Sequence, residues 1–333
     1  MKTSNLSRTL CNVLALIGGL FLAGASPLFS EDQSRLEVKD RQPLKTLAHE
    51  YWSAAFSNDG GLLATGSGDG VITLWETVAW QSKQILVGKR ARLWNVMFSP
   101  DNKRLLVASY GQSAEVWDIA AGKVIFALEQ DHRDGCVMAA FSPDGKWIAT
   151  GSWAKTVNVW DANTGNLVHT LYGHEESVWG IAFSPDSMHL ATGGHDKMIR
   201  IWNPATKVLE MSIATPAAVW SLSYSPDGKR LAASMDKEVG LWDSATGNTV
   251  FTASGHAGRI FKVAYSPDGK QLATGGDDQV IKLWDADTGE QRMAFRGHNE
   301  RVTKVAFHRS GEFLASVSKD GTIKIWPTDS VKP

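Results

Sequence analysis

Short apolar runs alternate with polar turn segments along almost the whole chain. In one stretch, the apolar runs Val178–Phe183, Leu190–Thr192 and Ile199–Trp202 are separated by a turn at Ser184–Asp186 and by a loop that contains Asp196. Runs of this length, rich in β-branched and aromatic residues and bounded by turn residues, are typical of strands and too short for ordinary helices. The pattern therefore predicts short antiparallel strands joined by tight turns.

One tryptophan marks a fixed place in each copy of this pattern. The successive intervals between these tryptophans are 42, 43, 42, 40, 42 and 42 residues, and the positions are Trp75, Trp117, Trp160, Trp202, Trp242, Trp284 and Trp326. No helix or coiled coil produces such a period, which indicates an array of repeated supersecondary units. The chain therefore contains seven copies of one unit.

Two kinds of turn recur within the units. The tetrapeptide Ser-Pro-Asp-Gly occurs at Ser142–Gly145, Ser225–Gly228 and Ser266–Gly269. Proline sets φ for the second residue of a type I turn, aspartate bonds to the backbone, and glycine accepts the exit conformation. A second turn follows most of the tryptophans, as at Asp161–Gly165 and Asp285–Gly289. Each unit is therefore predicted to contain three or four antiparallel strands.

The N-terminal 30 residues differ from the repeats and have the features of an export signal. Lys2 and Arg8 precede an apolar stretch over Val13–Ala23, and a small-x-small cleavage signature follows at Ala23–Ala25. We expect cleavage after Ala25. The alternative is an uncleaved anchor, although the strongly apolar stretch is shorter than the ~20 residues that a membrane-spanning helix needs.

Composition narrows the classes of function. The 333 residues include 34 Lys and Arg against 35 Asp and Glu, so the chain lacks the basic excess of a protein that binds polyanions. Cys11 and Cys136 are too few for a disulfide framework or a cysteine-rich metal site. Removal of the signal would leave Cys136 as the single thiol, and we expect it to be buried.

Together these elements resemble the WD-repeat family of β-propellers, over roughly Pro43 to Pro327. In that family a repeat has Gly-His before the innermost strand, an Asp in a tight loop and Trp-Asp at the end of the third strand. His174, Asp196 and Trp202 illustrate the pattern here. The tryptophan is the constant part, because it is followed by Asp in four repeats and by Glu, Asn or Pro in the others. The resemblance implies an all-β, seven-bladed β-propeller.

The last repeat has only three strands of its own in this sequence. The segment Leu44–His49 has the residue types of Val168–His174, so it can supply the outer strand of the last blade. We expect the ring to close by this pairing, which removes exposed strand edges. The expected division is a signal peptide over 1–25, a linker over 26–42 and the propeller over 43–333.

The resemblance also implies a buried hydrogen-bond network of His, Ser or Thr, Asp and Trp in each repeat. Three repeats contain all four members, namely His174, Thr192, Asp196 and Trp202; His256, Thr274, Asp278 and Trp284; and His298, Ser316, Asp320 and Trp326. The second repeat lacks three of the four members and the fifth lacks two, and we expect their blades to be the least stable. These histidines are structural and are not candidate catalysts.

The seven innermost strands line the channel of such a propeller, and none of them contains Asp, Glu or His. They are Trp52–Phe56, Trp94–Phe98, Val137–Phe141, Trp179–Phe183, Trp220–Tyr224, Phe261–Tyr265 and Thr303–Phe307. A metal ion or a general base in the channel would need such side chains. The sequence also lacks zincin, haem-attachment, phosphate-loop and nucleophile-elbow motifs. We therefore expect no catalytic residue, no metal site and no cofactor.

Aromatic residues recur near the start of the innermost strands. In WD-repeat proteins this position, the residue two before it and the residue before the network Asp face the top rim of the channel, where partners usually dock. The resemblance thus implies a partner-binding rim formed by Trp52, Trp94, Trp179, Trp220, Phe261, Arg92, Arg259, Arg301, Trp153, His195 and Lys319. Aromatic and arginine side chains dominate interface hot spots. The alternative is that the rings stack on one another and plug the channel.

The leading interpretation is an exported, periplasmic or secreted, monomeric scaffold that is not an enzyme and binds a protein or peptide but no nucleic acid. No stable membrane insertion is expected if the signal is cleaved. One alternative is a carbohydrate or small-ligand binding module, because Trp faces also stack on sugars. Another is a non-catalytic subunit of an enzyme complex. Lys262 and Lys304 could accept an anion in the channel, but we interpret them as solvated lysines.

Overall fold

The computed structural model describes residues 43, 45–48, 51–88, 91–110, 114–128 and 136–328. The expected signal peptide and linker lie outside these residues, so neither is tested. The described residues form 28 strands, and among them no helix is long and apolar enough to cross a membrane.

The strands form seven four-stranded antiparallel sheets, which we number as blades 1 to 7. The strands of each blade are given from the innermost outward. Blade 1 consists of β2 (Tyr51–Phe56), β3 (Leu62–Ser67), β4 (Val71–Glu76) and β5 (Ser82–Val87), and blade 2 consists of β6 (Leu93–Phe98), β7 (Arg104–Ser109), β8 (Ala114–Asp118) and β9 (Lys123–Leu128). Blade 3 consists of β10 (Cys136–Phe141), β11 (Trp147–Ser152), β12 (Val157–Asp161) and β13 (Leu167–Leu171), and blade 4 consists of β14 (Val178–Phe183), β15 (Leu190–Gly194), β16 (Met198–Trp202) and β17 (Leu209–Ala214). Blade 5 consists of β18 (Val219–Tyr224), β19 (Arg230–Met235), β20 (Glu238–Asp243) and β21 (Thr249–Ser254), and blade 6 consists of β22 (Ile260–Tyr265), β23 (Gln271–Gly276), β24 (Ile281–Asp285) and β25 (Gln291–Phe295). Blade 7 consists of β26 (Val302–Phe307), β27 (Phe313–Ser318), β28 (Thr322–Pro327) and β1 (Lys45–Ala48).

The Ser-Pro-Asp-Gly turns connect the first two strands of a blade by side-chain chemistry. In blade 3 the Ser142 hydroxyl donates to Asp144 at 2.6 Å and accepts from the backbone N–H of Trp147 at 2.9 Å. Gly145 closes the turn with a φ of 73°, a left-handed conformation that favours glycine. The same bonds recur at Ser225 and Ser266, so one short motif fixes three hairpins.

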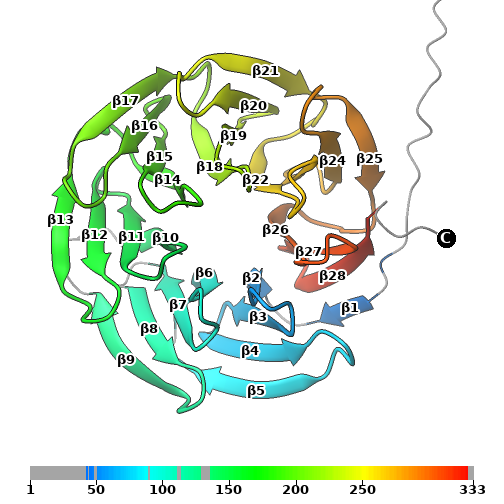
Figure 1. The fold of residues 1–333 in the computed structure, drawn as a ribbon. Helices are drawn as coiled ribbons and strands as arrows, with labels where there is room; N and C mark the ends of the chain where they lie inside the picture. Colours follow the sequence, from blue (N-terminus) through cyan, green and yellow to red (C-terminus); the bar gives the residue numbers. More distant parts are fainter. Residues whose placement is uncertain are drawn as a thin grey trace, which may run out of the picture. The chain divides into compact units, whose positions relative to one another are not determined.

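The ring closes as predicted. β1 pairs with β28 in an antiparallel register that sets Lys45 opposite Ile325 and Leu47 opposite Ile323. Figure 1 shows β1, in blue, along the outer edge of the last blade, beside the red β28. Leu47 is buried with side chains of blades 1 and 7. The predicted fold class, a seven-bladed β-propeller closed by an N-terminal strand, is confirmed.

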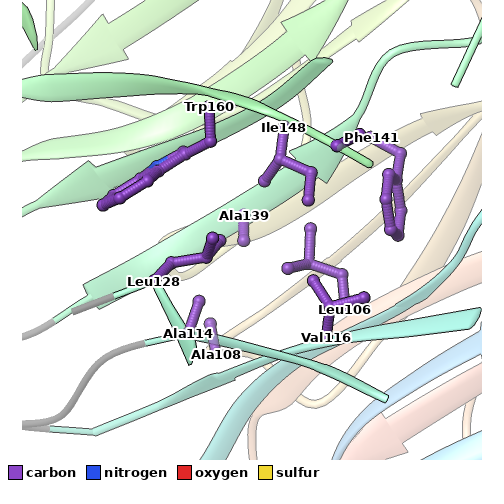
Figure 2. Close-up of a cluster of buried hydrophobic side chains, with 10 residues drawn as sticks. Leu106, Ala108, Ala114, Val116, Leu128, Ala139, Phe141, Ile148 and Trp160 are labelled. Atoms are coloured by element: carbon purple, nitrogen blue, oxygen red, sulfur yellow. The ribbon is translucent and has the colours of Figure 1, made fainter. Parts of the chain in front are cut away.

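The hydrophobic core lies between the blades. Figure 2 shows one interface, in which Leu106, Val116 and Leu128 of blade 2 face Phe141 and Trp160 of blade 3. Six further clusters of buried apolar residues fill the other six interfaces, including the one between blades 7 and 1. Each blade therefore buries both of its faces against neighbours, which places the channel and its loops at fixed positions.

Three blades contain the complete hydrogen-bond network that the resemblance implied. In blade 4, His174 Nδ1 lies 3.0 Å from Asp196 and Nε2 lies 2.8 Å from the Thr192 hydroxyl, which also accepts the Trp202 indole N–H at 2.9 Å. Equivalent bonds occur at His256 in blade 6 and in blade 7. Because a carboxylate only accepts hydrogen bonds, Nδ1 carries the proton. The network ties the loop before each innermost strand to the loop between the second and third strands.

The other described networks are partial. The indoles of Trp75 and Trp160 each donate to the threonine of their own blade, at 3.0 and 2.8 Å. In blade 2 the network is replaced by a pair that sequence reasoning missed, in which Trp117 donates to the buried carboxylate of Glu115 at 3.1 Å. His49 and His132 lie outside the described residues.

Burial and hydrogen bonding move the pKa values in these networks. Burial, opposed by the hydrogen bond and charge of Asp196, lowers the pKa of His174, and His298 behaves in the same way. Burial of the Asp320 carboxyl would raise its pKa. Hydrogen bonds from Thr322, from the backbone of Asn299 and from His298 outweigh this effect and lower the pKa to about 2.

Replacing Thr192 by Val should destabilise the protein by about 2 to 4 kcal/mol, because the indole N–H of Trp202 and Nε2 of His174 would both lose their buried partner. Ser234→Ala is the matched control, since the buried Ser234 hydroxyl has no hydrogen-bond partner among the described residues. Its cost should stay below about 1 kcal/mol. Urea unfolding of both variants tests this, and equal costs would contradict the role of the network.

Acid should destabilise the fold in two stages. Because folding lowers the pKa of His174 and His298, the unfolded chain binds more protons below about pH 6.5, and the free energy of unfolding falls there. The Asp320 carboxyl, only 8% exposed, adds a loss of about 2 kcal/mol as the pH falls from about 4 to about 2. Urea unfolding at a series of pH values measures both stages. In Asp320→Asn the second stage should shrink, and a pH-independent stability would contradict the assignment.

Candidate functional site

A backbone irregularity repeats in all seven innermost strands. In each one the register with the second strand shifts across the second residue, as between Tyr51 and Ser53 in β2. The extra residues are Trp52, Trp94, Val137, Trp179, Trp220, Phe261 and Thr303. A β-bulge of this kind leaves one residue out of the ladder and redirects its side chain. The seven bulges therefore define one ring of positions at the end of the channel where the innermost strands begin, which we call the top face.

Five of these seven residues form what we call the aromatic collar, namely Trp52, Trp94, Trp179, Trp220 and Phe261. Successive ring centroids are 5.7, 6.0, 5.2 and 5.6 Å apart along the collar. These distances are typical of favourable aromatic pairs. All five side chains are half-buried, so each ring both supports its neighbours and presents a surface.

The collar surrounds a cavity of about 310 Å³, the collar cavity. Besides the collar it is lined by Arg92, Met138, Ser221, Arg259, Lys262, Arg301, Thr303, Lys304 and Lys319. The packing that the plugging alternative requires is therefore present, but it leaves an open space at the centre. Apolar faces with a few polar and charged groups are typical of ligand sites.

Blade 3 has no aromatic residue at the bulge, and two other rings occupy this part of the top face. Tyr110 lies 6.0 Å from Trp94 and 6.1 Å from Trp153, which in turn lies 5.6 Å from Trp179. Sequence reasoning named Trp153 but missed Tyr110. The signal was available, because Tyr110 precedes Gly111, which takes the place of the network Asp in the second repeat.

Three arginines lie over the collar rings. The guanidinium carbons of Arg92, Arg259 and Arg301 lie 4.2, 4.6 and 5.6 Å from the ring centres of Trp52, Trp220 and Phe261. Arg301 also approaches Asp277 at 3.9 Å. Cation–π contacts of this kind hold flat, charged surfaces beside the apolar rings.

His195 supports the collar from behind. Its ring stacks on Trp179 with an interplanar angle of 13° and lies 4.5 Å from the ring of Trp220. Burial, and then the charge of Arg259, lower its pKa. Among the residues predicted for the rim, nine line the collar cavity, whereas Trp153 and His195 contact it only through Trp179 and Trp220.

The floor of the collar cavity corrects one expectation. Lys262 and Lys304 are half-buried in the channel rather than solvated, because each follows the bulge residue of its strand and lies at the middle of the channel. Burial lowers the pKa of Lys262 to about 8, and burial together with the charge of Lys262 lowers that of Lys304 to about 7. Met138 completes this level, with its sulfur 3.6 Å from the Lys304 ammonium.

The collar cavity offers aromatic rings for stacking and the positive charges of arginine and lysine side chains. No carboxylate or imidazole belongs to its lining, and the described part of the chain has no cluster of three or more His, Cys, Asp or Glu side chains that could hold a metal ion. A larger hollow of about 1140 Å³ lies at the opposite face, between the Ser-Pro-Asp-Gly turns. Charged groups there already pair with each other, as His189 does with Glu210 at 2.7 Å and Arg230 with Asp243 at 2.8 Å.

Comparison with known families yields matches to both halves of the ring. A family described as "WD domain, G-beta repeat" matches residues 41–76, 80–118 and 122–161. A second, described as the second β-propeller of echinoderm microtubule-associated protein, matches residues 178–333. Together the two descriptions cover repeats on both sides of the ring.

Similar proteins share short segments with this chain. Protein tipD of Dictyostelium discoideum is 35% identical over 74 residues, which are 22% of this chain and 12% of that protein. Protein Atg16l2 of Homo sapiens is 31% identical over 88 residues (26% and 14%), and WD repeat-containing protein 1 of Gallus gallus is 31% identical over 90 residues (25% and 15%). The matched segments thus span less than a fifth of each relative. The repeats, the closed ring and the family matches agree, and the chain belongs to the WD-repeat family of β-propellers.

Proposed function

We propose that this protein is a non-catalytic scaffold that captures a protein or peptide partner on its top face, through the aromatic collar and the arginines above it. WD-repeat propellers are generally protein-interaction scaffolds. The observation that carries the proposal is the open collar cavity. A partner that docks there can displace the water that still contacts the aromatic rings, and desolvated aromatic rings contribute strongly to binding.

The form of the site favours a macromolecular partner over a small ligand. Tyr110 and Trp153, which extend the aromatic surface beside the collar, are 48% and 42% exposed. An exposed apolar surface continuous with a cavity is typical of interaction sites. The inter-blade core holds these rings in place before binding, so little ordering entropy is lost when a partner docks.

We further propose that the protein is exported and that its signal is removed after Ala25. The support is the sequence of the first 25 residues, with positive charge before an apolar stretch and a small-x-small end. Capture would then take place in the periplasm or outside the cell.

The double variant Trp179→Ala/Trp220→Ala should weaken partner binding about 100- to 1000-fold, because each hot-spot ring contributes about 2 kcal/mol. The partner is first isolated by cross-linking in the producing cells, and its affinity is then measured by calorimetry. Trp80→Ala/Trp147→Ala is the matched control, since both indoles are half-buried but lie away from the top face. It should bind normally.

Two results would contradict this function. Unchanged affinity of the collar variant would exclude docking at the collar, and a fall in melting temperature well beyond that of the control pair would assign the rings to packing. A glycan array probed with the wild type separates the carbohydrate alternative, because specific retention of a glycan would favour it.

Intact-mass analysis of the protein recovered from its producing cells tests export. We expect a mature chain that begins at Ser26, in the envelope or secreted fraction. A full-length chain in the cytosol would contradict export, and a full-length chain in the membrane fraction would support the uncleaved anchor.

A further inference from the structure

Two residues that line the collar cavity have buried polar atoms without a hydrogen-bond partner among the described residues. Ser221 is only 1% exposed, lines the cavity, and its hydroxyl has no hydrogen-bond partner among the described residues. The indole N–H of Trp94, which lines the same cavity, and Nε2 of His195 behind it also have none. Buried polar groups are almost always paired in folded proteins. Two of the unpaired groups in the described residues therefore belong to side chains that line this one cavity.

The charges around the cavity are all of one sign. Six cationic side chains line it, namely Arg92, Arg259, Lys262, Arg301, Lys304 and Lys319, and its lining includes no carboxylate. This is unlike the chain as a whole, which carries a net charge of −1. A cavity with one sign of charge and apolar walls concentrates the opposite charge.

The two lysines lie deepest and are the least satisfied. Arg92 and Arg259 rest on collar rings, and Arg301 is near Asp277. Lys262 and Lys304 form no ion pair within the described residues, and Lys304 is oriented toward the sulfur of Met138. Burial lowers the pKa of Lys262 to about 8, and burial with the charge of Lys262 lowers that of Lys304 to about 7. An anion at this floor would relieve the repulsion between them.

We propose that the floor of the collar cavity is an anion site that receives a carboxylate of an acidic peptide segment, between Lys262 and Lys304. This proposal rests on the proposed function and specifies the chemistry of its partner. Lys262, Lys304, Ser221 and Met138 come from the residue after the bulge on four innermost strands. The same bulges therefore create the collar and the anion site below it.

The occupant is part of a peptide rather than a free small anion. The cavity of about 310 Å³ is large enough to enclose a side chain, while the exposed rings of Tyr110 and Trp153 extend the apolar surface beyond it. A lone carboxylate would leave that surface uncovered. A carboxylate is the anion that an unmodified Asp or Glu side chain supplies, and its apolar stem matches the apolar walls above the lysines.

The test uses an array of peptides in which one position is flanked by random apolar residues. That position is Asp or Glu in the first set, the matched amide Asn or Gln in the second, and phosphoserine in the third. The wild type should prefer the acid to the amide by about tenfold or more. Lys262→Met/Lys304→Met should lose this preference while it still retains apolar peptides. Trp179→Ala/Trp220→Ala should lose all retention. Lys229→Met/Lys270→Met, two exposed lysines in the turns of the opposite face, is the matched control and should behave as the wild type.

The pH dependence adds a second signature. The other charged groups that line the cavity with the lysines are Arg92, Arg259, Arg301 and Lys319, and His195 lies behind the collar. Binding of a carboxylate favours the charged lysines and raises their pKa. Affinity for the acidic peptide should therefore be highest between about pH 5 and 7 and fall about tenfold or more by about pH 9. The amide peptide should show no such fall.

A measurement without any peptide separates the two proposals. Iodide, an anionic quencher, should reduce the tryptophan fluorescence of the wild type more than that of Lys262→Met/Lys304→Met, whereas neutral acrylamide should affect both equally. The lysine variant should also melt at or above the temperature of the wild type, because it removes two half-buried like charges, and this confirms that it folds.

Each outcome decides one of the proposals. Peptide retention with no preference for acids, or a preference that survives in the lysine variant, overturns the anion site and leaves the scaffold function intact. Stronger retention of phosphoserine than of Asp or Glu overturns the assignment to a carboxylate. Glutarate that competes at the same concentration as the best peptide overturns the peptide in favour of a small carboxylate. No retention of any peptide overturns the assignment to a peptide, whereas equal iodide quenching of the wild type and the lysine variant overturns the anion site itself.

Discussion

Packing between neighbouring blades is the constraint on which everything else in this structure depends. A four-stranded blade has no core of its own, because its apolar side chains point to both faces and meet only those of the next blade. The pairing of β1 with β28 is what makes this arrangement complete, since it gives the seventh blade its fourth strand and joins the two ends of the chain. The seven innermost strands then have little freedom, and the channel acquires a fixed width at every level.

The polar networks act on top of this packing. Each complete network holds the loop that enters a blade from the previous one, and two of these loops carry arginines that lie over the collar. Arg259 follows the network residue His256 by three positions, and Arg301 follows His298 by three. The hydrogen bonds of a buried histidine thus help to fix the position of an arginine three residues further along the chain. In blades 6 and 7 the placement of candidate binding residues therefore depends on the structural hydrogen bonds.

The repeat pattern and its resemblance to the WD-repeat family were sufficient to predict the fold. Seven regularly spaced tryptophans, the Ser-Pro-Asp-Gly turns and the strand-like segment near Lys45 led to the number of blades and to the mode of closure, both of which are confirmed. Such features are visible because they recur, and because turn chemistry is local. The candidate rim followed from alignment of the repeats together with the positions that face the top of the channel in WD-repeat proteins, and nine of its eleven members line one cavity.

What the sequence did not reveal depends on distances between repeats. The bulge that directs Trp52 and its equivalents is a register shift between two strands, which no single strand encodes. The burial of Lys262 and Lys304 arises because seven strands converge on one axis, so that a polar residue on an innermost strand is partly enclosed whatever its own neighbours in sequence are. The bond from Trp117 to Glu115 replaces a missing threonine by a residue type that the repeat pattern does not contain.

The bulges have a consequence for how such a protein can change. A residue that stands outside the hydrogen-bonded ladder contributes no pairing of its own, and blades 3 and 7 already carry Val137 and Thr303 there without loss of the sheet. Side chains at this level can therefore be exchanged one at a time while the scaffold stays the same. Substitutions at these seven positions can therefore change what the top face binds while the propeller fold is kept.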